Sequence, residues 1–128
     1  GSAEVFGGPM PAGCLFAPAA FLQKNPRTVQ AMTNAIVRAL KWLQTAGPSD
    51  LLQAVPESYL LGDRALYLAA FGKMREAISP DGLVPDDGPR TALRALAAVD
   101  ASIRPERTEL TRLYTNEFAR RAKDLLKA

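Results

Sequence analysis

Apolar side chains recur along most of the chain at the three- and four-residue spacings of helices that bury one side. Asn25 and Pro26 are residue types that favour a helix start, and Gly47 with Pro48 ends the pattern. Between them lies the clearest apolar stripe, formed by Val29, Met32, Ile36, Leu40 and Leu43. The pattern therefore predicts a long helix that begins at Pro26 and stops before Gly47.

Weaker patterns predict about five further helices, separated by turn-rich segments such as "SPDGLVPDDGP" and the linker "DASIRPER". These helices are expected around Phe21 and Leu22, over residues 49–55, from an Asp63 cap through Tyr67, Phe71, Met74 and Ile78, from about Pro89 with Leu93, Leu96 and Ala97, and from Thr115 or Asn116 with Phe118, Ala122 and Leu125 inward. A mostly helical chain is the result.

Residues 13–17, "GCLFA", differ from this pattern, because they form a short apolar run between Gly13 and Pro18. Such a run predicts a buried strand. Unpaired strand backbone costs about 1–3 kcal/mol for each buried group, so the strand needs a partner. The candidates are the segment "AEVFGG", a second copy of the chain, or sequence outside it.

The chain has 128 residues, of which 48% are hydrophobic and 23% charged, the composition of one folded domain. Residues 1–2 are interpreted as the remnant of a cleaved tag, residues 3–17 as an arm with the short strand, and residues 18–128 as a helical part. Without an initiating Met or a signal sequence, the chain is expected to be a fragment. No apolar run reaches the length that a bilayer span requires.

Composition also limits the chemistry. The net charge is +3, but basic residues alternate with acidic ones, so nucleic acid is not an expected partner. With no histidine, the commonest general base and metal ligand are missing, so neither a catalytic nor a metal site is predicted. Asp81, Asp86 and Asp87 are interpreted as turn and capping residues, and Cys14 as a small buried thiol.

Several segments, in their order, resemble the C-terminal half of solute-binding proteins of ABC importers. The class is that of nitrate, sulfonate and taurine, which shares the type II periplasmic-binding-protein fold with the thiamine-pyrimidine synthases. The resemblance extends from about Phe6 to Ala122 and rests on "FGGPMPAG", "FLQKNPRTVQAMTNAIVRALKWL", "VPESYLLGDRALYLAAF", "SPDGLVPDDGP" and "LYTNEFARRA".

The resemblance implies an α/β clamshell in which a small anion or organic solute lies between two lobes and the loaded protein docks on a membrane permease. This chain would be part of one lobe, helical with one or two short N-terminal strands, in a periplasmic parent protein. No cofactor is implied. The segment placed nearest the cleft consists of Phe6, Gly7, Gly8, Pro9 and Met10.

Three other interpretations stay open. The chain could be a helical protein–protein interaction module without a small ligand. A synthase of the thiamine-pyrimidine kind is disfavoured, because that chemistry uses a histidine that this sequence lacks. For Gly7 and Gly8, a hinge or tight turn is the simpler alternative to a ligand contact. The unpaired strand further predicts a homodimer in which residues 3–17 exchange between protomers.

Overall fold

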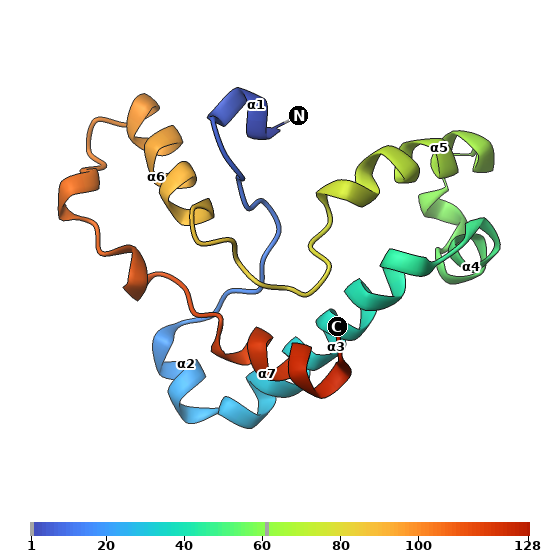
Figure 1. Ribbon diagram of the computed structural model, residues 1–128, viewed down its shortest axis with the longest axis horizontal. Helices are drawn as coiled ribbons and strands as arrows, with labels where there is room; N and C mark the ends of the chain where they lie inside the picture. Colours follow the sequence, from blue (N-terminus) through green and yellow to red (C-terminus); the bar gives the residue numbers. More distant parts are fainter. Residues whose placement is uncertain (1, 61) are drawn as a thin grey trace.

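A computed structural model describes residues 2–60 and 62–128, and in this part of the chain every regular element is helical (Figure 1). The α-helices are α1 (Ser2–Phe6), α2 (Ala19–Lys24), α3 (Pro26–Thr45), α4 (Pro48–Ala54), α5 (Arg64–Met74), α6 (Gly88–Val99) and α7 (Glu117–Leu126). Short 3₁₀ turns are η1 (Glu57–Tyr59), η2 (Arg75–Ala77), η3 (Pro105–Arg107) and η4 (Leu110–Arg112).

The predicted strand is wrong. Residues 13–17 form an uncoiled connection between α1 and α2, and the suggested partner "AEVFGG" is helix α1 followed by a turn (Figure 1). Residues 9–17 make no backbone hydrogen bond to any other described residue, and no β-ladder forms among the described residues. The strand-exchange dimer loses its basis here. Cys14 is exposed rather than buried, since nothing covers this connection.

The helix boundaries follow the sequence signals closely, although Asn25 acts differently from the prediction. Asp63 caps α5 by accepting a hydrogen bond from the Leu66 N–H at 3.0 Å. Asn25 occupies the N-cap of α3, but its side chain donates to the Phe21 carbonyl of α2 instead. This bond joins α2 to α3 across the Pro26 break.

The pair α3–α7 holds the centre of the molecule, and the two helices run in the same direction. The Gln30 side chain donates to the Phe118 carbonyl at 2.9 Å, and Lys41 Nζ donates to the Leu126 carbonyl at 2.6 Å. A cation at the carbonyl end of α7 also faces the negative end of its helix dipole. Val37 of α3 and Ala122 of α7 are almost completely buried in this region.

Each of the two helices buries part of its predicted inward stripe. On α7, Ala122 is buried as predicted and Ala119 is buried as well, whereas Leu125 is 69% exposed. On α3, Val29, Leu40 and Leu43 of the predicted stripe are half-buried, but Met32 and Ile36 are 53% and 42% exposed, and the buried residue is Val37. The buried side of α3 is therefore centred near Val37 and includes only part of the predicted stripe.

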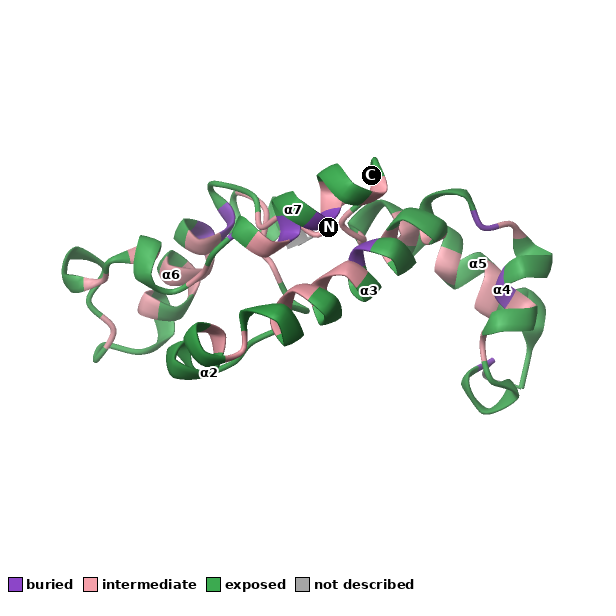
Figure 2. Cartoon of the chain, turned by 90° about the horizontal axis from the view of Figure 1, so that it is seen from below, coloured by how far each residue is buried: buried purple, intermediate pink, exposed green. Residues whose placement is uncertain are grey.

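The core is small for the chain length. Figure 2 shows buried residues as isolated purple patches on a ribbon that is mostly exposed or intermediate. Helices α4 and α5 lie at one end of the molecule and α6 at the other, with α2, α3 and α7 between them (Figure 1). In the described chain the buried apolar residues are Val37, Ala46, Leu51, Leu60, Ala119 and Ala122.

Candidate functional site

The predicted cleft segment begins where α1 ends. Phe6 is the last residue of α1 and is 42% exposed. Gly7 has a φ of +70°, a left-handed conformation that glycine adopts without strain, and the Gly8 N–H donates to the Ala3 carbonyl at 3.0 Å. The two glycines thus form the tight turn that was the alternative to a ligand contact.

Beyond this turn, the segment packs on the start of α6. A Cβ atom added to Gly8 would lie 2.7 Å from Thr91 Oγ1, and one added to Gly88 would lie 2.7 Å from Pro11 Cγ. Thr91 is 2% exposed, and its hydroxyl donates to the Asp87 carbonyl at 3.0 Å. The close approach that Gly8 permits is therefore to Thr91 of the same chain, with Pro9 and Met10 half-buried beside it.

Replacing Gly8 by Ala is expected to destabilise the chain by about 1–2 kcal/mol, because Thr91 is buried and hydrogen-bonded and cannot move aside cheaply. Urea unfolding measures the change. Gly13→Ala is the matched control, since a Cβ at Gly13 meets nothing within 4 Å. Equal stability of the two variants would contradict the packing of Gly8 on Thr91.

The two most specific motifs of the sequence meet beside α3. Asn116, from "YTNEF", is 8% exposed, and its side-chain amide accepts from the Val84 N–H and donates to the Val84 carbonyl, both at 2.9 Å. Val84 belongs to "SPDGLVPDDGP". The asparagine side chain thereby satisfies both backbone groups of Val84, as a neighbouring strand would do.

A second contact of the "SPDGLVPDDGP" segment is the ion pair of Asp81 with Lys123, which lies just beyond "LYTNEFARRA" on α7. Lys123 Nζ lies 2.7 Å from Asp81 Oδ2, and the Asp81 side chain is 18% exposed. Partial burial by itself would raise the pKa of Asp81, but the hydrogen bond and charge of Lys123, together with the Leu83 N–H and Ser79, hold that pKa below its ordinary value. Asp81 closes a turn, as predicted for it.

The lowered pKa of Asp81 predicts a loss of stability in acid. The folded chain binds this proton more weakly than the unfolded chain, so the stabilisation is complete above the unfolded pKa of about 4 and is lost as the pH falls below it. In urea unfolding, Asp81→Asn is expected to be less stable than the parent at pH 7 and to approach it below pH 4. Asp124→Asn, an exposed change beside Lys123 on α7, is the control. A gap that is independent of pH would contradict this role.

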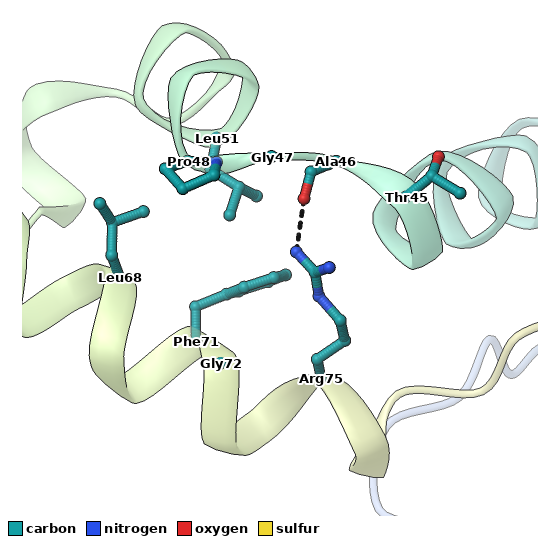
Figure 3. A pocket seen from close by; sticks show the side chains of 9 residues that line it. All are labelled: Thr45, Ala46, Gly47, Pro48, Leu51, Leu68, Phe71, Gly72 and Arg75. Atoms are coloured by element: carbon teal, nitrogen blue, oxygen red, sulfur yellow. Dashed lines mark hydrogen bonds between the residues drawn. The ribbon is translucent and has the colours of Figure 1, made fainter.

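A hollow of about 430 Å³ lies between the α3–α4 connection and α5 (Figure 3). Its walls are mostly apolar, with Leu51, Leu68 and Phe71 facing one another. The Arg75 guanidinium stands 5.1 Å from the Phe71 ring centre and donates to the Ala46 carbonyl at 2.5 Å, while its buried Nε–H has no partner. The hollow suits an apolar group better than an ion, because this cation is already engaged.

Sequence reasoning did not identify Thr91, Asn116 or Arg75 as structurally central. Their partners are 4, 32 and 29 residues away in the chain, and only the Thr91 spacing is a local helical one.

Among residues 2–60 and 62–128, no group of three or more His, Cys, Asp or Glu side chains is arranged to hold a metal ion. In the same part of the chain no helix is long and apolar enough to cross a membrane.

Comparison with known proteins gives one informative match. A protein chain from Bordetella bronchiseptica RB50, whose structure has been solved, is 53% identical in sequence and superposes with a TM-score of 0.94. The match covers 98% of this chain and 40% of the Bordetella chain, so the present chain spans well under half of that protein's length. No protein-family model and no curated protein matches the sequence.

Proposed function

We propose that the chain is part of the solute-binding component of an ABC importer of the nitrate, sulfonate and taurine class. The observation that carries the proposal is the ordered set of sequence motifs along nearly the whole chain. The two most specific motifs also contact each other, through Asn116 with Val84, and Lys123 next to the second motif pairs with Asp81 of the first. A binding lobe needs such internal ties if it is to move as one body when it closes on a solute.

The match to a much longer chain supports the same proposal. In a clamshell, the solute is buried between two lobes, so a chain of this size would supply only part of the binding surface. The parent protein would then act in the periplasm, take up a small anion or organic solute and dock on the permease. The cleft-facing segment in this proposal is Phe6–Met10. Phe6 is its one aromatic residue and is 42% exposed.

Calorimetric titration with nitrate, taurine, alkylsulfonates and amino acids tests the proposal. We expect this chain alone to bind nothing more tightly than about millimolar, the weak end of the affinity scale. A chimera, in which this chain replaces its counterpart in the Bordetella protein, is expected to bind one of these solutes at least about a hundredfold more tightly. Micromolar binding by this chain alone, or no binding by the chimera, would contradict it.

In the same chimera, Phe6→Ala is expected to weaken binding about tenfold if Phe6 faces the solute, a loss of about 1.4 kcal/mol. Val5→Ala is the matched control, because Val5 is the neighbouring apolar residue of α1 and is 77% exposed. An equal affinity of the two variants would remove Phe6 from the proposed site.

A helical interaction module is the second candidate, and the uncovered apolar side chains favour it. The same titrations separate the two candidates, because a module of this kind would bind no solute even in the chimera.

A further inference from the structure

The accessible surface of this chain is too large for a compact monomer. It measures 9549 Å², whereas a compact protein of this length exposes about 6,600 Å². The difference is about 2,900 Å², well above the roughly 800 Å² that each partner buries in a standard protein–protein contact. To cover this much excess surface, a polypeptide of domain size is required, and a peptide or a transient partner would be too small.

One continuous part of this surface lies on α3. We call it the α3 face and define it by five residues whose spacing places them on one side of the helix: Met32, Ala35, Ile36, Ala39 and Trp42. All five are exposed, with Trp42 at 41%. Ala35, Ala39 and Trp42, together with Arg38, line a hollow of about 410 Å³.

The chain itself covers the side of α3 that lies opposite the α3 face. Helix α7 packs near Val37, and a Cβ atom added to Gly82 would lie 3.0 Å from Val37 Cγ2 and 3.6 Å from Leu40 Cδ1. Because the amphipathic helix already has one buried side, its second apolar side has no role within the chain.

The connection between α1 and α2 is uncovered as well. Residues 12–17 are exposed, with Phe16 at 94% and Leu15 at 56%, and within the described chain their backbone groups have no hydrogen-bond partner. Backbone groups of this kind can pair with a strand of another polypeptide segment. Apolar surface is therefore uncovered at two places, the α3 face and residues 12–17, and at residues 12–17 the backbone is unpaired as well.

The Bordetella match indicates which polypeptide covers this surface. The same fold, at a TM-score of 0.94 and 53% identity, occupies 40% of a longer chain, so this open arrangement persists where more polypeptide is present. A second copy of this chain fits less well, since obligate dimer interfaces bury about 1,000–2,500 Å² on each partner and only the largest exceed this range. We propose that the α3 face is the docking surface for the polypeptide that corresponds to the remaining, larger part of the Bordetella chain.

This proposal rests on surface and size and not on the proposed transport function, so a failure to bind solute would leave it intact. Hydrogen exchange on this chain and on the chimera tests it. Peptides from α3 and from residues 12–17 are expected to exchange at least about tenfold more slowly in the chimera. In the chimera, Ile36→Asp is expected to lower the melting temperature by roughly 5–10 °C, because a charge would be buried without a partner.

Leu125→Asp is the matched control, because Leu125 is also an exposed apolar residue but lies on α7 outside the α3 face. It is expected to shift the melting temperature of the chimera by less than about 2 °C. Equal effects of the two variants, or unchanged exchange of α3 in the chimera, would overturn the proposal.

A measurement on this chain alone covers the case in which the chimera does not fold. The uncovered α3 face is expected to bind an apolar dye such as anilinonaphthalene sulfonate, and Met32→Asp with Ile36→Asp is expected to reduce that fluorescence at least about twofold. An unchanged dye signal in the double variant would overturn the proposal. So would a stable homodimer with a protected α3, since the occupant would then be a second copy.

Discussion

Val37→Asp is expected to unfold the α3–α7 pair, with a loss of about 3–5 kcal/mol in the free energy of unfolding. Val37 is 1% exposed, and its side chain touches the turn at Gly82. A carboxylate at this place would lose its hydration without gaining a cation. Since single domains are stable by only about 5–15 kcal/mol, much of the stability of this small core would be lost.

The neighbouring residue supplies the control. Ile36→Asp introduces the same side chain one position earlier in α3, where the parent residue is 42% exposed, and is expected to change the stability of this chain by less than about 0.5 kcal/mol. Urea unfolding followed by circular dichroism measures both variants. Comparable losses would mean that the α3 face is buried in this chain, and both the fold description and the docking proposal would then be wrong.

Asn116→Leu is expected to cost about 2–4 kcal/mol, because it leaves the N–H and the carbonyl of Val84 without a partner in a partly buried place. Leucine has the same number and branching of side-chain heavy atoms as asparagine but no hydrogen-bonding group, so the change removes the two bonds without opening a cavity. The turn-rich segment 79–87 would then lose its two hydrogen bonds to Asn116 and keep the ion pair of Asp81 with Lys123 of α7. Urea unfolding gives the loss, and hydrogen exchange at Val84 locates it.

Asn25→Leu is the comparison for this prediction. The Asn25 side chain makes one long bond of 3.3 Å to the Phe21 carbonyl at the surface, so its loss should cost less than about 1 kcal/mol. If Asn116→Leu were as mild as Asn25→Leu, Val84 would have another partner or water in place of Asn116, and the tie between the two motifs would carry little stability.

Local signals in the sequence were sufficient for most helices. Pro26 and Gly47 bracket α3, and Asp63 caps α5 at the expected residue, because helix ends are fixed by backbone groups within one turn of the chain. The turn chemistry of Asp81 could likewise be anticipated from "SPDG". The glycines of the predicted cleft segment form a turn that packs on Thr91, and the ligand contact of this segment stays a prediction.

What the sequence determined by itself is therefore the helices α2 to α7 and most of their ends, since both depend on neighbours a few residues away. Only the tertiary structure decided that residues 13–17 are not a strand, because a strand exists through its partner and none is present in the described chain. Only the tertiary structure decided which side of α3 is buried. Periodicity identifies an apolar side of a helix, but the position of α7 and of the Gly82 turn determines that Val37 is covered and that Met32 and Ile36 stay exposed.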